Sequence, residues 1–139
     1  MATTYLIDSN ILIYAANEDS PHQKPASQIM SKVITGNINA CLSYQTLYEF
    51  YAIITDPKRV ESPISPKKAQ ETIELYMMAS NIKKIFPQKT NLQNTLSLLN
   101  KYEVSKQAIF DLVLIATMMD NGVQGVIYNN IFPRFKGIN

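Results

Sequence analysis

Short apolar segments alternate along the chain with longer segments in which apolar residues recur every three or four positions. Short segments of this kind are typical of buried strands, and the longer ones are typical of helices with one buried face. The pattern predicts strands at residues 4–7, 39–42, 82–86 and 125–128, and it allows a short fifth strand at 135–138. Strands that alternate with helices favour an α/β fold with a central parallel sheet flanked by helices.

Serine and threonine residues mark the predicted starts of most helices, because their hydroxyl oxygens accept hydrogen bonds from the first unpaired backbone N–H groups. The predicted caps are Ser20, Ser43, Ser65 and Thr90. Gln23 and Gln93 each follow a predicted cap by three residues, which is the spacing of a capping box. The apolar segment at residues 106–122 should form a long helix that ends at Asn121 and Gly122.

The composition of the chain is that of a globular protein. It has 139 residues, of which 46% are hydrophobic and 17% are charged. These proportions suit one well-packed domain, predicted to span residues 1–139. No apolar run reaches the roughly 18 residues of a membrane helix, and no basic N-terminal segment precedes an apolar one. We therefore expect no membrane partner and a cytoplasmic location.

The single cysteine, Cys41, and the single histidine, His22, limit the chemistry that the chain can perform. One cysteine excludes an internal disulfide, and the two residues are too few for a zinc site. Cys41 is predicted to be a small buried apolar residue. A bound metal ion would therefore have oxygen ligands.

Positive charge is spread along the chain in small groups rather than in one basic tract. The net charge is +2, and the basic pairs are Lys58 with Arg59, Lys67 with Lys68, Lys83 with Lys84, and Arg134 with Lys136. Scattered pairs are typical of a solvated surface, and they are also compatible with a groove that follows phosphates. Charge alone therefore does not identify a nucleic-acid partner.

Three polar residues, Asp8, Ser9 and Asn10, interrupt the apolar segment YLIDSNILIYAA at residues 5–16. They follow the first predicted strand and begin a helix predicted at residues 9–17. Ser9 and Asn10 are expected to cap this helix and to organise the acid. In open α/β sheets, ligands bind at the carboxyl ends of the strands. That is the predicted position of Asp8.

Two further acids, Glu49 and Asp111, lie in the apolar segments LYEFYAII and AIFDLVLIAT. No lysine or arginine lies three or four residues from either acid, so neither can form an ion pair of that spacing within its own helix. Taken singly, each acid also has a structural interpretation. Asp8 could be a helix N-cap, Glu49 could reach solvent, and Asp111 could favour the helix dipole.

The positions of the three acids in the predicted fold favour a shared site. Helices in a parallel α/β sheet begin at the carboxyl ends of strands, so Glu49 and Asp111 should project toward the same rim as Asp8. Two carboxylates about 4 Å apart repel by about 4 kcal/mol at an effective dielectric constant of about 20. A divalent cation relieves this repulsion. Oxygen ligands suit Mg²⁺ or Mn²⁺, which can activate water and stabilise charge on a phosphodiester, as nucleases require.

Four separated segments, YLIDSNILIYA, LSYQTLYEFYAII, IFDLVLIATMMDNGV and FKGI, resemble PIN-domain proteins of the VapC toxin type. The resemblance covers nearly the whole chain and implies a single PIN-like α/β/α domain around a parallel sheet. It also implies a homodimeric endoribonuclease that depends on Mg²⁺ or Mn²⁺, cleaves RNA and is blocked by a cognate antitoxin. In this resemblance Asp8, Glu49 and Asp111 are the metal-binding catalytic acids, and Asn10 supports them by hydrogen bonding.

The chain departs from the family pattern after the last predicted core strand. Family members usually have a fourth acid there, whereas the segment VIYNNIFPRFKGI contains no Asp or Glu. Asn129 or Asn130 would take its place, and an amide oxygen can bind a metal ion or hold a water but carries no charge. Three acids favour a first metal ion and leave a second open. An alternative is therefore a PIN fold that binds RNA or antitoxin without cleavage.

A phosphatase that uses Asp8 as its nucleophile is a further alternative. The sequence disfavours it, because Asn10 stands two residues after Asp8, where a second acid is expected. None of the 4 glycines lies near Asp8 to form a phosphate-binding loop.

The aromatic residues of the second motif are interpreted as packing residues. Tyr44, Tyr48, Phe50 and Tyr51 are assigned to the core or to a dimer contact rather than to base stacking. A dimer formed through the early helices would bury Tyr14 or Tyr51.

Overall fold

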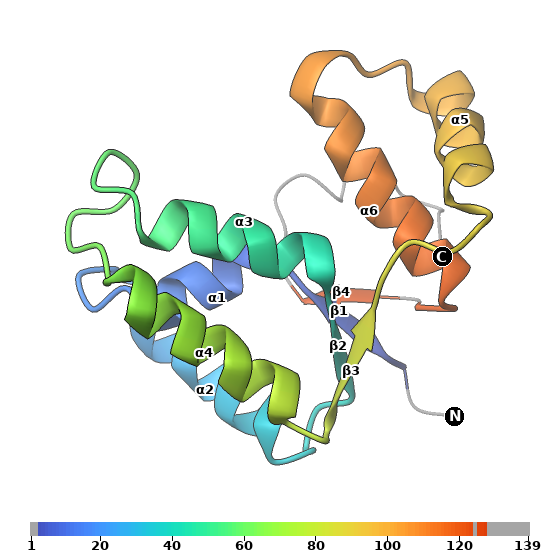
Figure 1. Ribbon diagram of the computed structural model, residues 1–139. Helices are drawn as coiled ribbons and strands as arrows, with labels where there is room; N and C mark the ends of the chain where they lie inside the picture. The colour runs from blue at the N-terminus through green and yellow to red at the C-terminus, as the bar shows by residue number, and fades with distance from the viewer. Residues whose placement is uncertain (1–2, 124, 128–139) are drawn as a thin grey trace.

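Four parallel strands form one sheet in the order β3-β2-β1-β4 (Figure 1). The computed structural model describes residues 3–123 and 125–127. The strands are β1 (Tyr5–Ile7), β2 (Ala40–Ser43), β3 (Ile82–Ile85) and β4 (Gly125–Ile127). The predicted α/β fold with a parallel sheet is confirmed, and these strand ends lie within one residue of the prediction. The strand predicted at 135–138 falls outside the described residues.

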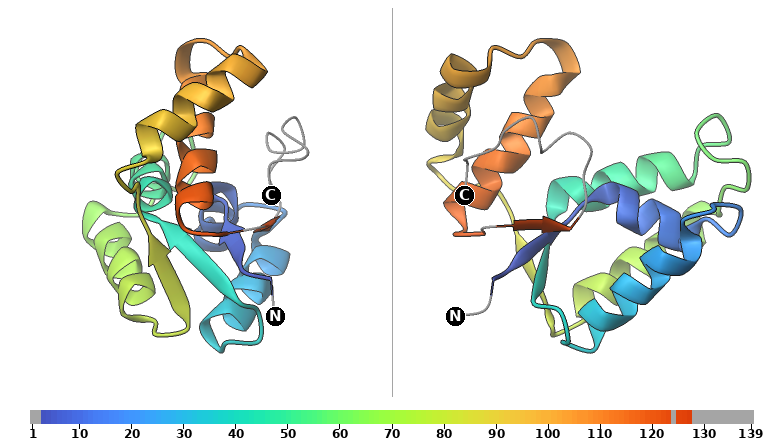
Figure 2. Two further views of the ribbon diagram at one scale, coloured as in Figure 1. Left: turned by 90° about the vertical axis from the view of Figure 1, so that its right-hand side faces the viewer. Right: turned by 180° about the vertical axis from the view of Figure 1, so that it is seen from behind.

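Helices join successive strands and cover both faces of the sheet (Figure 2). They are α1 (Ser9–Ala16), α2 (Gln23–Ile34), α3 (Tyr44–Ile54), α4 (Pro66–Met78), α5 (Asn91–Tyr102) and α6 (Ile109–Asp120), with a short 3₁₀ turn, η1 (Lys106–Ala108), before α6. These α-helices have 8 to 13 residues. Within the described ranges, no helix is long and apolar enough to cross a membrane.

Alternate residues of the strands pack against different helices. Ile7 and Leu42 belong to a core that includes residues of α1, α2, α3 and α4. Leu6 and Cys41 point to the other face, where they pack with Leu114 of α6. Cys41 is fully buried, as predicted, and its burial raises the pKa of the thiol to about 12. The sheet is therefore the middle layer of an α/β/α arrangement.

Two of the four predicted serine and threonine caps are confirmed. Ser43 Oγ accepts a hydrogen bond from the backbone N of Thr46 at 3.0 Å, and Ser65 Oγ accepts one from that of Lys68 at 3.1 Å. These bonds satisfy N–H groups that have no partner inside α3 and α4. The predicted end of α6 is also confirmed, because Gly122 follows it with a φ of +66°.

The predicted cap at Ser20 is wrong, whereas Thr90 does stand at the N-cap position of α5 but makes no side-chain cap hydrogen bond. Ser20 Oγ accepts a hydrogen bond from the backbone N of His22 within a turn, and α2 begins only at Gln23. The side-chain amide of Gln23 donates to the backbone of α1. The hydroxyl of Thr90 donates to Asp120 on α6. Neither predicted capping box forms.

The direction in which strands are added to the sheet reverses at β1. The chain passes from β1 to β2 and β3, and then returns to place β4 on the other side of β1. Gly125 permits this pairing, because a Cβ there would lie 3.0 Å from the ring of Tyr5. Right-handed crossovers in opposite directions place their helices on opposite faces. Ligands of open α/β sheets bind beyond the strand ends at such a reversal, and Asp8 directly follows the last residue of β1.

Asp120 at the end of α6 joins this helix to the start of α5. Its carboxylate accepts hydrogen bonds from Thr90 Oγ1 at 2.7 Å, Asn94 Nδ2 at 2.8 Å, the backbone N of Gln88 at 3.1 Å and Asn91 Nδ2 at 3.2 Å. Partial burial of Asp120 raises its pKa, but the hydrogen bonds outweigh this effect and hold the pKa below its ordinary value. The four bonds therefore stabilise the folded chain when Asp120 is ionised.

We expect Asp120→Asn to lower the free energy of unfolding by about 1–2 kcal/mol at neutral pH, a value that allows for solvent exposure of these charged hydrogen bonds. A folded-state pKa below the unfolded value gives stability that is present above about pH 4 and is lost as the pH falls through the folded pKa. Urea denaturation at about pH 7 and about pH 3 measures both effects. Glu71→Gln, at an exposed acid of α4, is the control. An equal loss at both pH values would contradict this explanation.

Candidate functional site

Asp8 lies at the junction of β1 and α1. It is the N-cap of α1, and its Oδ2 accepts a hydrogen bond from the backbone N of Asn10 at 3.2 Å. The predicted capping by Ser9 and Asn10 is therefore wrong, because these residues form the first turn of the helix and Asp8 caps it. Asp8 is nevertheless only 5% exposed. A charged side chain this buried is rare unless it serves as a ligand or is paired.

The pKa of Asp8 is affected by the charges of the other two predicted acids. This pKa is raised from 3.8 to about 6, and burial is the largest cause. The negative charges of Glu49 and Asp111 also contribute to the rise, whereas the backbone hydrogen bonds of Asn10 and Ser9 lower the pKa. The fold thus brings together three acids from separate parts of the chain, at the rim where they were expected.

Glu49 lies in the second turn of α3, and both of its carboxylate oxygens accept hydrogen bonds. Its Oε2 accepts a hydrogen bond from the hydroxyl of Ser9 at 3.3 Å, and its Oε1 accepts one from the side-chain amide of Gln45 at 3.0 Å. Glu49 is half-buried. Neutral donors from α1 and α3 therefore orient this acid. The contact with Ser9 agrees with the supporting role predicted for that residue.

Gln45 also connects α3 to the helix that carries the third acid. The same amide nitrogen that binds Glu49 donates to the backbone O of Phe110 at 3.0 Å. Phe110 directly precedes Asp111 in the first turn of α6. Sequence reasoning missed Gln45. The available signal was its spacing of four residues from Glu49, which places both side chains on one face of a helix.

Asp111 is half-buried near the start of α6. A negative side chain is favourable there, because unpaired N–H groups give the N-terminus of a helix a partial positive charge. The turn η1 leads into the helix, and Lys106 at its start has a φ of +56°, in the left-handed region that side chains rarely adopt. This turn sets the position of the first residues of α6.

The oxygen donors of this site suit a hard divalent cation. Asp8, Glu49 and Asp111 supply only carboxylate ligands, the type that Mg²⁺ and Mn²⁺ prefer. The mutual charge effects on Asp8 are those that a cation would relieve. In the described part of the chain, however, no three His, Cys, Asp or Glu side chains meet closely enough to form a complete metal site. The predicted supporting residues Asn129 and Asn130 lie outside the described residues.

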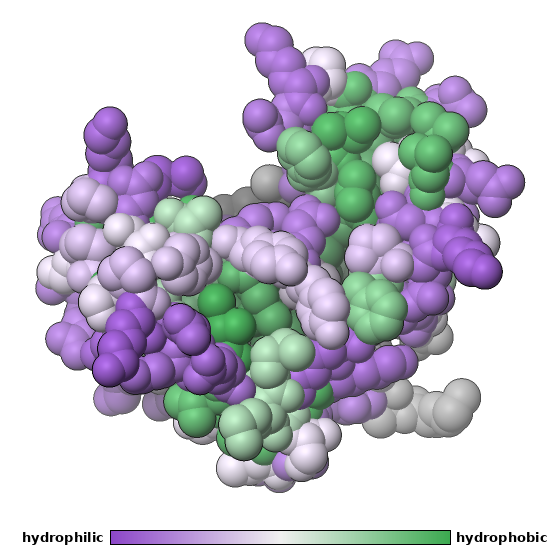
Figure 3. Space-filling view, in the orientation of Figure 1, coloured by the Kyte–Doolittle hydropathy of each residue, from purple (hydrophilic) through white to green (hydrophobic). Residues whose placement is uncertain are grey.

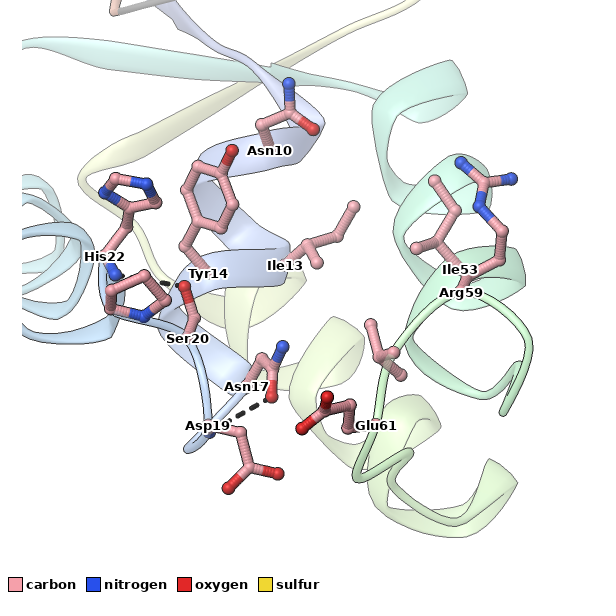
Figure 4. A pocket seen from close by; sticks show the side chains of 12 residues that line it. Asn10, Ile13, Tyr14, Asn17, Asp19, Ser20, His22, Ile53, Arg59 and Glu61 are labelled. Carbon is pink, nitrogen blue, oxygen red and sulfur yellow. Dashed lines mark hydrogen bonds between the residues drawn. The ribbon is translucent and has the colours of Figure 1, made fainter.

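Two pockets lie near the acids, and Glu49 and Asp111 line one of them. We call the larger one the aromatic pocket; it encloses about 1010 Å³ between α3 and α6, and its lining includes Tyr44, Tyr48, Glu49, Arg59, Phe110 and Asp111. The α1 pocket encloses about 510 Å³, and its lining includes Asn10, Tyr14, Asn17, His22, Arg59 and Glu61. Figure 4 shows Asn10 and Tyr14 on α1 across this second pocket from Ile53 and Arg59. Arg59 is the residue common to both linings.

A third, apolar groove lies between α3 and α4. It encloses about 360 Å³ and is lined by Tyr44, Leu47, Tyr48, Ile73 and Met77. Figure 3 shows the apolar side chains that gather there. Tyr44 and Tyr48 line both this groove and the aromatic pocket, so the two hollows are neighbours.

Comparison with known proteins agrees with the fold. The family model described as the PIN domain matches residues 5–138. The chain belongs to the PIN-domain family. This match confirms the family resemblance of the four sequence segments. PIN-domain ribonucleases generally use a divalent metal ion.

Curated relatives extend over most of this PIN domain. Ribonuclease VapC37 of Mycobacterium tuberculosis is 21% identical over 133 residues, which cover 96% of this chain and 92% of the relative. Ribonuclease VapC24 of the same species is 25% identical over 126 residues, which cover 90% and 85%. Both relatives carry the VapC name that the sequence resemblance indicated.

Solved structures show the same fold. M. tuberculosis VapC20, described as a toxin that cleaves the sarcin-ricin loop, has a TM-score of 0.70 and 10% identity over 95% of each chain. VapBC2 from Rickettsia felis, bound to a promoter DNA fragment, has a TM-score of 0.64 and 16% identity, with 96% of this chain and 94% of the other covered. At these identities the likeness concerns the fold.

Asp8 should make the metal-free protein less stable as the pH rises. A folded pKa above the unfolded value gives stability that is fully present below about pH 4 and is lost as the pH rises through about 6. The rise from 3.8 to about 6 corresponds to about 3 kcal/mol. Asp8→Asn keeps a good N-cap, so we expect it to stabilise the protein at pH 7 relative to wild type.

Urea denaturation in EDTA at about pH 4.5 and about pH 7.5 measures this difference. We expect the gain in stability of Asp8→Asn over wild type to be larger at the higher pH. Comparison of the two proteins removes the contributions of other titrating groups, such as Asp120. A gain of the same size at both pH values would show that the charge of Asp8 is not the cause.

Proposed function

We propose that this PIN domain is an endoribonuclease that depends on Mg²⁺ or Mn²⁺, and that it is the toxin of a VapBC-type toxin–antitoxin pair. The observation that carries the proposal is that Glu49 on α3 and Asp111 on α6 both act by their charges on Asp8, which directly follows β1. The family match over residues 5–138 and the ribonuclease names of the relatives support it.

In this proposal Asp8, Glu49 and Asp111 are the catalytic residues that hold the metal ion. A divalent cation at these carboxylates would supply an activated water and would stabilise charge on the phosphodiester during hydrolysis. The side chains around the acids serve to position them. Ser9 and Gln45 hydrogen-bond to the two carboxylate oxygens of Glu49, and Asp111 lies at the N-terminus of α6, where a negative side chain is favourable.

The ionisation of Asp8 sets the pH range of the proposed activity. With a pKa of about 6 in the metal-free protein, Asp8 is mostly ionised at pH 7 and available as a ligand. Below about pH 6 protons compete with the cation for its carboxylate. Activity should therefore fall as the pH drops through this range.

The proposed partners are an RNA substrate, an antitoxin protein and a second copy of the chain. Structural relatives include a toxin–antitoxin complex from Klebsiella pneumoniae, with a TM-score of 0.57 and 19% identity, which covers 96% of this chain and 92% of the other. Of the two tyrosines considered for a dimer contact, Tyr51 is 38% exposed and Tyr14 is half-buried beside the ring of His22. Tyr51 is thus the better placed for contact with a second copy.

We expect Asp8→Asn, Glu49→Gln and Asp111→Asn each to reduce RNA cleavage by about 100-fold or more, the loss typical when a group that stabilises transition-state charge is removed. Cleavage of labelled RNA in Mn²⁺ or Mg²⁺ measures the effect, and EDTA should abolish it. Glu71→Gln is again the surface control. Undiminished cleavage by Asp8→Asn would refute the proposed nuclease site. Mn²⁺ binding by calorimetry separates cleavage from the alternative of RNA or antitoxin binding alone, which predicts no saturable metal binding.

Gln45→Leu should weaken Mn²⁺ binding by about 10-fold, since loss of a group that orients a metal ligand costs about 10- to 100-fold in affinity. The matched control is Gln70→Leu on α4. Gln70 donates to Glu74 with the same spacing and the same 3.0 Å length as the Gln45–Glu49 bond, but it lies on an exposed surface. Titration calorimetry compares the two variants. Equal Mn²⁺ affinities would show that Gln45 does not position Glu49 for metal binding.

A further inference from the structure

We propose that the aromatic pocket is a subsite for one unpaired nucleobase of an RNA strand, which stacks on Tyr48 and Phe110 beside the catalytic acids. The inference rests on the proposed ribonuclease function and adds the recognition of a single-stranded base to it. Four features of the described residues support it: exposed rings, their adjacency to the acids, the size of the pocket, and one arginine at its edge.

The rings of Tyr48 and Phe110 are unusually open to solvent. Tyr48 is 74% exposed and Phe110 is 53% exposed. Tyr48 therefore departs from the core packing considered for its aromatic cluster, whereas Phe50 is fully buried as expected. The ring–ring contacts recorded in the described part of the chain join Tyr14 to His22 and Tyr44 to Phe86. The faces of Tyr48 and Phe110 are thus available to a ligand.

Each exposed ring directly precedes an acid in the sequence. Tyr48 precedes Glu49 on α3, and Phe110 precedes Asp111 on α6, and all four residues line the same pocket. The amide of Gln45 holds the two helices in this arrangement, because it bonds both Glu49 and the backbone of Phe110. A base between the rings therefore places an adjoining phosphate near the acids.

The volume and character of the pocket suit a flat, partly apolar ligand. Its space of about 1010 Å³ is at the upper end of the range of about 300–1,000 Å³ for small-ligand sites. Stacking of a base on an aromatic side chain contributes about 1–3 kcal/mol and tolerates any base. A base inside a duplex has both faces stacked already, so the pocket favours an unpaired nucleotide.

The position of Arg59 indicates the path of the bound RNA strand. Among the residues that line the aromatic pocket and the α1 pocket, it is the one lysine or arginine. It is exposed, and a guanidinium group binds phosphate oxygens with two parallel hydrogen bonds. The chain of an RNA whose base lies in the aromatic pocket would pass Arg59 and the acids toward Asn10 and the α1 pocket.

The test measures binding of a short single-stranded RNA that carries 2-aminopurine, in EDTA so that no cleavage occurs. We expect Tyr48→Ala and Phe110→Leu each to weaken binding by about 5-fold or more and to reduce the change in 2-aminopurine fluorescence on binding. Tyr48→Phe keeps the ring and should bind as wild type does. Leu92→Ala removes an apolar side chain on α5 that is 69% exposed, a value between those of Phe110 and Tyr48, and that lies outside both pockets. This control variant should bind RNA as wild type does.

The outcomes separate this inference from the proposed function. If wild type cleaves and binds RNA but Tyr48→Ala and Phe110→Leu bind as tightly as Leu92→Ala, the base subsite is refuted and the nuclease stands. A duplex of the same sequence that binds as tightly as the single strand also refutes the subsite. If wild type neither binds nor cleaves RNA, both proposals fall. In cleavage assays the aromatic variants should raise KM with little change in kcat. This result would distinguish a role of the rings in substrate binding from damage to the catalytic acids.

Discussion

The burial of Asp8 at the end of β1 is the constraint on which the rest of the site depends. β1 lies between β2 and β4, so its carboxyl end is at the point where the order of strand addition reverses. The side chain of Asp8 is held there because its carboxylate also caps α1. The cost of that burial appears as the rise of its pKa to about 6. The charges of Glu49 and Asp111 add to this cost, and a cation at the proposed metal site would offset it.

The sequence predicts the fold where local signals and tertiary contacts agree. Ser43 and Ser65 cap their helices with hydroxyl oxygens that accept from the first turn, and the hydroxyl of Ser43 also donates to Thr46 Oγ1 at 2.8 Å without giving up its cap. Ser20 and Thr90 have the same local signal, but a turn and the carboxylate of Asp120 take their hydroxyls instead. Asp120 is far from Thr90 in the sequence, so no local pattern could indicate the pairing.

The acids of the site were predictable for a different reason. A lone carboxylate in an apolar segment is costly to bury, and Glu49 and Asp111 are conspicuous on that ground. Gln45 and Arg59 carry no such signal, because polar residues on helices and loops are usually solvated. Their importance comes from the packing of α3 beside α6 and from the path of the loop after α3. Periodicity and composition do not contain that information.

The exposed rings and the buried acid are two aspects of one arrangement. Tyr48 and Phe110 project outward because their neighbours Glu49 and Asp111 turn toward Asp8, and adjacent helix residues point about 100° apart. Orienting the acids inward therefore leaves a large apolar surface open beside them, at a cost in hydration. A globular domain would normally bury such rings. Their exposure at the acids is explained if a ligand covers them while the acids act on its phosphate.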